Sequence, residues 1–420
     1  MLNRLFFKYI RKGYLRIKVA LQWILFAVVA GIVIGLVGTA FYHSMKFVTD
    51  LRGDFPLLIL LLPVGGLSIV GLYHLFGAKK DPGTNLVLSA IHSEDDIPLR
   101  MAPLIFISTI LTHLTGGSAG REGAALQIGG SIGNGISKLF RFEGKEQKVF
   151  IMCGMSAAFS AVFGTPLAAA VFSMEVVSVG IMHYSAFLPC VISSLIAHEI
   201  ALALGAHPEH FLVTDIPDFS LVPALEIALL AGLCAGISIL FCLLLHGSGS
   251  FFTKTFKNPY VRVLAGSGIL LTATLLIGNQ DYNGAGMDVI EQCFAQGVPP
   301  YAFILKMLLT AVTLAVGFKG GEIVPTFFIG ATFGCVFGSL TGLSPALCAA
   351  VGMGSVFCGV TNSPITSLLI CFELFGFEGM PYYLLAIALS YVLSGYYGLY
   401  QSQKIVYSKY KNQYINRKTR

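Results

Sequence analysis

The chain has 420 residues, of which 55% are hydrophobic and only 11% are charged. A mean hydropathy of +0.78 excludes a soluble globular domain of this length and predicts a polytopic membrane protein surrounded by the lipid bilayer. The net charge of +6 reflects basic residues gathered at the two ends of the chain. It therefore indicates membrane topology and gives no reason to expect a nucleic-acid partner.

Two basic segments begin and end the chain. Residues 1–20 contain six Lys or Arg and no acid, and their amphipathic pattern predicts a cytoplasmic helix lying on anionic headgroups rather than a cleaved signal. Residues 401–420 also contain six Lys or Arg and no acid, and predict a basic cytoplasmic tail. Because cytoplasmic segments retain basic residues, we expect both termini to be cytoplasmic and the protein to cross the cell membrane an even number of times.

Apolar runs account for most of the remaining chain. Several are shorter than the roughly 20 residues that a full crossing needs, and others are long enough to contain two shorter helices. The runs are Leu21–Tyr42, Pro56–Phe76, Leu104–Leu114, Val149–Val177, Phe187–Leu204, Ala224–Leu245, Val261–Ile277, Phe303–Val316, Phe327–Leu340, Leu347–Phe375 and Tyr382–Leu399.

Two glycine-rich segments interrupt these runs, and each carries a carboxylate. Glu122 lies within the first segment, 116–123, and Glu322 directly follows the second, 317–321. An ionisable group at membrane depth is costly unless it faces protein or water, and paired interruptions in two halves point to a transport site. Two structural alternatives remain: Glu122 caps its helix, or Glu322 forms a salt bridge with Lys319 or Lys306. Glycine also permits close helix packing.

The two halves of the chain repeat one plan. Gly154 returns as Gly352, Pro166 as Pro364 and Glu175 as Glu373, each 198 residues later. This predicts a first membrane repeat over residues 21–205 and a second over 206–400. Each proline is placed to begin a helix that ends near the glutamate, and we expect both glutamates to be structural. The residues alone do not show whether the repeats are parallel or inverted.

Signals for a metal site, a cofactor or an enzyme are weak. The nine cysteines include no CxxC pair, so neither a disulfide framework nor a metal site is expected. The cluster His207-Pro208-Glu209-His210 is typical of an exposed loop, and the sequence has no GxxxxGK[ST] phosphate loop. An intramembrane enzyme using Glu122 and Glu322 as acid and base is disfavoured, because no nucleophile–base pair accompanies them. We expect no enzyme activity and no cofactor.

The motifs around the two acids resemble those of the CLC superfamily, and the resemblance covers essentially the whole chain. Gly120-Arg121-Glu122-Gly123 is similar to the G(K/R)EGP signature, Gly321-Glu322-Ile323-Val324-Pro325 to GxFxP, and Asp81-Pro82-Gly83-Thr84-Asn85 to GSGIP. The resemblance implies an all-α polytopic membrane protein with an inverted-repeat fold, broken helices that meet near mid-membrane, and a homodimer. The C-terminal regulatory domains of many relatives are not expected, because only residues 401–420 follow the second repeat.

Departures from the common pattern resemble the fluoride/proton antiporter branch of this superfamily. Glu322 stands where chloride-handling relatives have an apolar residue, Thr84 replaces the selectivity serine, and Val176 replaces the proton-relay glutamate. The resemblance implies export of fluoride in exchange for protons, with gating and proton transfer by Glu122 and coupling by Glu322. A chloride/proton exchanger or a passive anion channel of the same fold is the alternative.

The chemistry of the helix starts is consistent with that assignment. Backbone N–H groups at a helix start bind anions without a lysine in the pathway, so Gly123 and Ile323 are expected anion contacts. Glu122 can occupy such a site when ionised and leave it when protonated, and a second acid nearby favours a proton held within the pathway. Arg121 is expected to act as a countercharge or helix-end anchor rather than as an ion ligand.

Fluoride is a strong hydrogen-bond acceptor, so replacing its water shell requires several close donors. Thr84, Asn85 and Tyr400 are the side chains expected to supply them. Lys306 lies within an apolar run, where contact with a carbonyl or carboxylate is its expected role.

Overall fold

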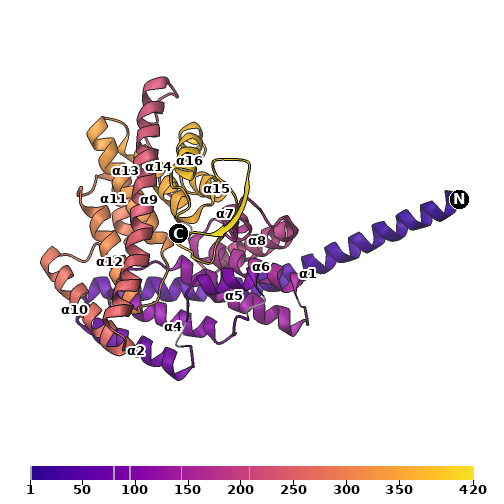
Figure 1. Cartoon of the computed structure of the whole chain (residues 1–420), viewed down its shortest axis with the longest axis horizontal. Coiled ribbons are helices and arrows are strands. Elements are labelled where there is room, and N and C mark those ends of the chain that lie inside the picture. Colours follow the sequence, from indigo (N-terminus) through magenta and orange to yellow (C-terminus); the bar gives the residue numbers. More distant parts are fainter. Residues whose placement is uncertain (1, 79–80, 94–95, 143, 208) are drawn as a thin grey trace.

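The chain forms a helical body from which one long helix extends (Figure 1). The computed structural model describes residues 2–78, 81–93, 96–142, 144–207 and 209–420, apart from the side chains of 2–11 and 15. The elements of the first half are α1 (Leu2–Asp54), η1 (Pro56–Leu61), α2 (Leu62–Leu75), α3 (Asn85–His92), α4 (Met101–Leu114), α5 (Glu122–Leu139), α6 (Lys145–Phe163), α7 (Pro166–Glu175), β1 (Ser178–Val179), η2 (Tyr184–Ala186) and α8 (Phe187–Ala203). Those of the second half are α9 (Leu221–Thr255), α10 (Pro259–Ile277), α11 (Met287–Ala295), α12 (Ala302–Val316), α13 (Ile323–Thr341), α14 (Pro345–Thr361), α15 (Pro364–Phe375), α16 (Met380–Leu393), β2 (Lys404–Tyr407) and β3 (Tyr414–Lys418).

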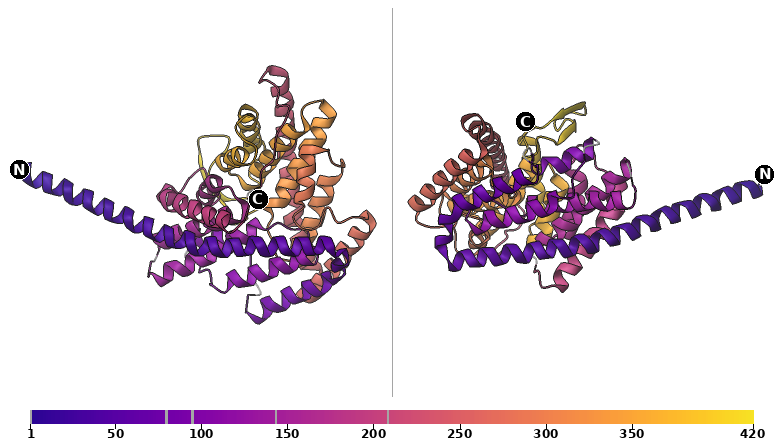
Figure 2. Two further views of the ribbon diagram at one scale, coloured as in Figure 1. Left: turned by 180° about the vertical axis from the view of Figure 1, so that it is seen from behind. Right: turned by 90° about the horizontal axis from the view of Figure 1, so that it is seen from below.

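Helix α1 runs without a break from Leu2 to Asp54. The structure therefore differs from the expectation of a separate surface helix over residues 1–20. No proline occurs between Leu2 and Asp54, so no residue there forces the helix to end before the apolar run begins. The N-terminal part of α1 projects away from the other helices in each view (Figure 2).

Six helical segments among the described residues are long and apolar enough to cross a membrane: Lys12–Asp54, Pro56–Leu75, Tyr184–Ala203, Leu221–Thr255, Pro259–Ile277 and Ile323–Thr341. Other apolar helices are shorter. As predicted, the run Val149–Val177 divides into α6 and α7, and the run Leu347–Phe375 divides into α14 and α15. Pro166 and Pro364 occupy the first turns of α7 and α15. This confirms their predicted position at the start of a helix.

Glycine brings neighbouring helices very close together in both halves. A Cβ atom at Gly129 on α5 would lie 2.0 Å from the carbonyl oxygen of Gly154 on α6. One at Gly330 on α13 would lie 2.4 Å from the carbonyl oxygen of Gly352 on α14. Close packing is therefore the role of these glycines, and the matching pairs show that both halves pack by the same plan.

Helices α7 and α15 cap each other. The carboxylate of Glu175, at the end of α7, accepts hydrogen bonds from the backbone N–H groups of residues 365 and 366 at 3.1 and 2.8 Å. The carboxylate of Glu373, near the end of α15, accepts from those of residues 167 and 168, both at 2.8 Å. The free N–H groups and the dipole of each helix start stabilise these carboxylates. Equivalent helices thus lie antiparallel, as in an inverted repeat, and these contacts are those expected of structural glutamates.

We expect Glu175→Ala to lower the melting temperature more than Glu373→Ala. The Glu175 carboxylate also accepts a 2.6 Å hydrogen bond from the Thr366 hydroxyl, and it is the more buried of the two. Each buried donor left without a partner costs about 1–3 kcal/mol. Thermal unfolding of the purified protein in detergent measures both changes. Wild-type Tm values in both variants would contradict the capping role.

The C-terminal segment folds onto the helices instead of forming a free tail. Strand β1 pairs in parallel with β2, and β2 pairs antiparallel with β3. Gln403 is fully buried and donates to the carbonyl oxygens of Val176 at 2.8 Å and Thr361 at 2.7 Å. The Thr419 hydroxyl donates to the carbonyl oxygen of Tyr400 at 2.6 Å. The expected basic tail is therefore an ordered hairpin, which fixes the backbone around Tyr400.

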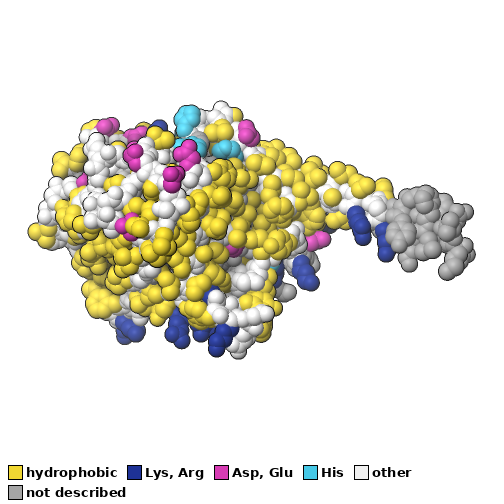
Figure 3. Space-filling model, turned by 90° about the horizontal axis from the view of Figure 1, so that it is seen from above, with side chains coloured by type: hydrophobic (Ala, Val, Ile, Leu, Met, Phe, Trp, Pro, Cys, Tyr) yellow, Lys and Arg dark blue, Asp and Glu magenta, His cyan; other side chains and the backbone are white. Residues whose placement is uncertain are grey.

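Charged side chains gather at opposite edges of the molecule (Figure 3). On the face shown, Asp, Glu and His lie mainly along the upper edge, Lys and Arg lie mainly along the lower edge, and hydrophobic side chains lie between them. Trp23 and Phe26 on α1 contact Phe140 and Phe142. The connection between α5 and α6 thus lies beside the part of α1 that contains Trp23 and Phe26. This face therefore has a hydrophobic band between an acidic and a basic edge.

Candidate functional site

The two glycine-rich segments that precede α5 and α13 lie against each other. The backbone N–H of Gly120 donates to the carbonyl oxygen of Gly321, and the N–H of Gly321 donates to the carbonyl oxygen of Gly120, both at 2.7 Å. This pair is an isolated antiparallel bridge. Equivalent segments of the two halves therefore meet in opposite directions, which is the inverted relation that the family resemblance implies. The bridge brings two helix starts, with their free N–H groups, to one place.

Several predicted site residues converge on Gly123. A Cβ atom at this position would lie 2.8 Å from Gly321 Cα, 3.2 Å from Glu322 Oε2 and 3.3 Å from Thr84 Oγ1. Only glycine lets the second segment approach the start of α5 this closely. Thr84 Oγ1 also accepts a 3.2 Å hydrogen bond from Gln127 Nε2, four residues further along α5. Three segments that are far apart in sequence thus meet beside Glu322.

Glu122 is fully buried, and its carboxylate faces Arg121. Oε1 lies 3.3 Å from Arg121 Nε, and Oε2 accepts a 3.1 Å hydrogen bond from the Arg121 backbone N–H. Arg121 also forms a 3.3 Å ion pair with Glu209, and its guanidinium lies 5.0 Å from the centre of the Tyr42 ring. These contacts fit the expected role of Arg121 as a countercharge. Movement of Glu122 away from this position requires the loss of its ion pair.

Glu322 has a buried carboxylate oxygen, Oε2, with no hydrogen-bond partner among the described residues. Lys319 does not pair with it, because its Nζ lies 2.8 Å from Asp81. A buried carboxylate oxygen without a donor is costly. This environment therefore favours a Glu322 carboxyl group that carries a proton, or one that contacts a bound ligand carrying a proton.

Lys306 is also committed to other partners. It is fully buried, and its Nζ donates to the carbonyl oxygens of Tyr282 at 3.2 Å and Gly284 at 2.7 Å. The prediction that Lys306 contacts a carbonyl is confirmed. The alternative of a structural salt bridge from Glu322 to Lys319 or Lys306 is wrong, because the ion pairs of the described residues include neither pair.

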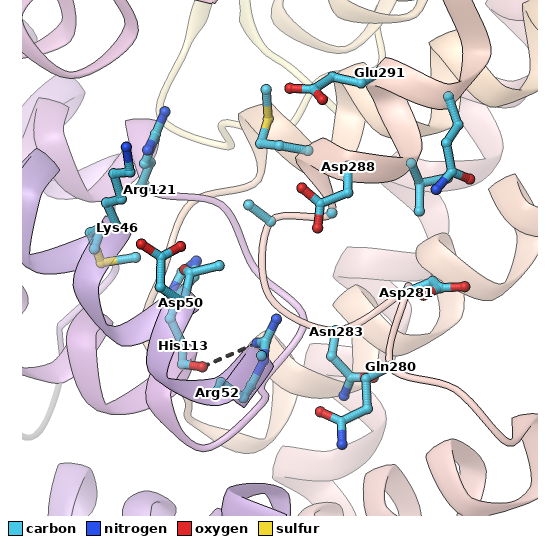
Figure 4. Close-up of a pocket in the computed structure, with 18 of the residues that line it drawn as sticks. Lys46, Asp50, Arg52, His113, Arg121, Gln280, Asp281, Asn283, Asp288 and Glu291 are labelled. Carbon is cyan, nitrogen blue, oxygen red and sulfur yellow. Dashed lines mark hydrogen bonds between the residues drawn. The ribbon is translucent and has the colours of Figure 1, made fainter. Parts of the chain in front are cut away.

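Two cavities are lined by residues next to the meeting point. The larger, of about 680 Å³, is lined by Arg121, Glu209 and further charged side chains (Figure 4). The smaller, of about 240 Å³, is lined by Asp81, Gln127, Lys319 and Glu322, with Pro82, Gly83, Ile105, Leu314, Phe318 and Gly320. Glu122 contacts Arg121, which lines the first cavity, and Glu322 lines the second, so each cavity reaches one of the two acids or its partner. This is the arrangement needed for a pathway controlled by carboxylates.

The other predicted anion contacts lie near this pathway. Tyr400 is 1% exposed, and its hydroxyl has no partner among the described residues. Ile323 is buried at the start of α13. Asn85 Oδ1 accepts a 2.9 Å hydrogen bond from the Ser402 backbone N–H, which ties α3 to the segment that carries Tyr400. The anion-binding role of these residues stays a prediction.

Sequence reasoning missed the roles of Gln127 and Glu209. The signal for Gln127 was its spacing of four residues from Gly123, which places both on one side of α5. Glu209 had no comparable signal, because it is 88 residues from its partner Arg121. The predicted loop around Glu209 includes Pro208, which lies outside the described residues. Among the described residues, no three His, Cys, Asp or Glu side chains gather where they could hold a metal ion.

Comparison with known proteins identifies the family. The Voltage gated chloride channel family matches residues 65–395. The chain is 35% identical to the chloride/fluoride channel protein of Pseudomonas syringae pv. tomato, over 93% of this chain and 88% of that protein. It is 24% identical to an H(+)/Cl(-) exchange transporter of Vibrio cholerae, over 83% of this chain and 81% of that protein. The crystal structure of a CLC-type fluoride/proton antiporter is similar with a TM-score of 0.88 and 33% identity, over 91% of this chain and 97% of that one. The chain therefore belongs to the voltage gated chloride channel, or CLC, family.

Proposed function

We propose that this protein is a secondary active transporter that exports fluoride in exchange for protons, and that it is not an enzyme. A similar curated protein is named for chloride and fluoride, and a similar solved structure is a fluoride/proton antiporter. The observation that carries the proposal is the unpaired Oε2 of Glu322 beside Gly123. It gives the pathway a second proton-binding carboxyl group, in a chain that has Val176 where many exchangers have a relay acid.

The two acids couple fluoride movement to proton movement, because their carboxylates compete with the anion for the free N–H groups at the helix starts. When Glu122 takes a proton, its ion pair with Arg121 is lost, and the carboxyl group leaves the start of α5 free for an anion. Fluoride then binds to free N–H groups at Gly123 and Ile323, which the helix dipoles make favourable. Glu322 holds the proton as the anion passes. Fluoride thus moves in one direction and the proton in the other.

The remaining donors fit a small, strongly hydrated anion. Thr84 Oγ1 accepts its hydrogen bond from Gln127, so the hydroxyl hydrogen of Thr84 is available for an anion. The Tyr400 hydroxyl is unpaired among the described residues, and Asn85 completes the proposed set. Several hydrogen bonds of this kind replace the water that fluoride loses.

We propose the cell membrane as the location, with both termini in the cytoplasm and two copies of the chain in a homodimer. The support for the orientation is the separation of charge, since basic residues are retained on the cytoplasmic side. The larger cavity is lined by Asp50 and Arg52, which are next to the C-terminal end of α1. With the N-terminus inside, this cavity faces outward. The support for the dimer is the family resemblance.

Flux from proteoliposomes tests the proposed function. Purified protein is reconstituted with fluoride or chloride inside, and anion efflux and internal pH are measured together. We expect much faster efflux of fluoride than of chloride, with protons moving inward. Equal fluxes with proton movement would favour a chloride/proton exchanger, the activity for which a relative at 24% identity is named. Anion flux without proton movement would favour a passive channel.

A further inference from the structure

One guanidinium holds two carboxylates at the edge of the larger cavity. Arg121 Nε lies 3.3 Å from Glu122 Oε1, and Arg121 Nη2 lies 3.3 Å from Glu209 Oε1. We propose that Glu209 is a positioning residue for the gate: by sharing Arg121 with Glu122, it sets the pH at which Glu122 is released. This inference rests on the proposed transport function and adds to it a group outside the CLC sequence motifs.

Contacts with α1 hold the connection between the two halves, which carries Glu209, close to Arg121. The Tyr42 hydroxyl on α1 donates to the carbonyl oxygen of His207 at 3.3 Å, and the His43 ring contacts the carbonyl oxygen of Leu204 at 2.9 Å. Arg121 in turn lies over the Tyr42 ring. The same part of α1 thus supports both Arg121 and the connection that supplies Glu209. The Glu209 side chain is only 23% exposed, so its charge is screened less than that of a free surface residue.

The shared guanidinium divides its charge between the two acids. A guanidinium offers separate N–H donors in a fixed fork, so Glu122 and Glu209 bind to Arg121 at the same time. An opposite charge at this distance favours the ionised form of a carboxyl group, whereas a like charge nearby disfavours it. Glu209 therefore reduces the electrostatic stabilisation that Arg121 gives to ionised Glu122. Without Glu209, Glu122 would remain ionised and paired to a lower pH.

Other charged or titratable groups line the same cavity as Glu209. They come from α1, the end of α4, the connection before α9, the connection before α11, and α11 itself: Lys46, Asp50, Arg52, His113, His207, Asp281, Asp288 and Glu291 (Figure 4). Figure 4 shows Arg121 on one wall and Asp288 and Glu291 on the other. Among the described residues, Glu122 and Glu209 are the two acids that form ion pairs with Arg121. Glu291 lines the same cavity but forms no ion pair with Arg121 in the described part of the chain, which makes it a matched control.

The test is the pH dependence of fluoride flux, varied on the side of the larger cavity. We expect Glu209→Gln to shift the half-maximal pH of the flux downward by about 0.5–1 unit, a fraction of the shift that a close ion pair causes. Arg121→Gln should shift it upward, because ionised Glu122 loses its countercharge. Glu291→Gln should shift it much less than Glu209→Gln. Glu209→Asp, which keeps the charge on a shorter side chain, should restore part of the wild-type profile.

Two outcomes would overturn the inference. One is a Glu209→Gln profile that matches wild type, and the other is equal shifts in Glu209→Gln and Glu291→Gln, which would assign the effect to the general charge of the cavity. Unchanged thermal unfolding of Glu209→Gln shows that the variant is folded. Wild-type protein that carries chloride but no fluoride would contradict the proposed function alone, because the same pH series can then be measured with chloride.

Discussion

Replacing Glu322 with glutamine or alanine is expected to abolish coupled exchange. Glutamine keeps the shape of the side chain but cannot hold the exchanged proton beside Gly123, and alanine removes the group entirely. A positioned proton-transfer group contributes about 10²–10⁴-fold to a rate, so we expect proton movement driven by a fluoride gradient to fall at least about a hundredfold. Simultaneous recording of fluoride efflux and internal pH in proteoliposomes measures the loss.

A matched control for this variant is Glu378→Gln, which changes an exposed acid in the connection between α15 and α16. It should retain wild-type fluoride efflux and proton uptake. Full coupling in Glu322→Ala would remove Glu322 from the mechanism, and with it the observation that carries the fluoride assignment. A chloride/proton exchanger of the same fold would then be the better description.

Glu122→Gln is expected to separate the two ions. The amide mimics a permanently protonated carboxyl group, so it cannot form an ion pair with Arg121 or cycle a proton. Proton movement should disappear, while the start of α5 remains open and anions flow down their gradient. The measurement is fluoride efflux under a pH gradient, which should drive uphill fluoride transport in wild type and fail to do so in the variant.

Glu146→Gln is the control for that experiment, because Glu146 also lies in the first turn of a helix, α6, but is exposed. It should keep proton-coupled transport. If Glu122→Gln still moved protons against a fluoride gradient, Glu122 would not be the gate. The Arg121 contacts would then describe only the anchoring of a helix end.

The helical fold was predictable because its signals are local. Apolar runs mark the helices, and Pro166 and Pro364 mark helix starts at equivalent positions. The direction of the repeats was not readable from the residues alone, because it depends on contacts such as the bridge between Gly120 and Gly321. The C-terminal hairpin was also missed, since the basic residues of that segment suggested a solvated tail.

The two central acids were predictable for a similar reason: a carboxylate among glycines in an apolar chain needs an explanation. The side chains that interact with these acids could not be predicted from the sequence. Lys319 pairs with Asp81, which is 238 residues away, and this leaves Glu322 without the salt bridge that its neighbouring lysine suggested. Sequence spacing cannot choose among several possible partners for one charge, because the choice depends on which side chains the folded backbone brings together.

The hydrogen bond between Asn85 and the Ser402 backbone has a consequence for how the protein is made. It joins residues 317 positions apart, so the segment that carries Tyr400 docks beside α3 only after nearly the whole chain has been synthesised. Contacts of such long sequence separation form late, because the loop they close is entropically costly. The first half lacks Glu322 and the glycine that packs against Gly123 until residues 321 and 322 are made, and the site lacks the Tyr400 hydroxyl for longer still. A ribosome-bound chain truncated before Tyr400 would therefore hold Glu122 in an unfinished site, and this state is a natural target for membrane quality control.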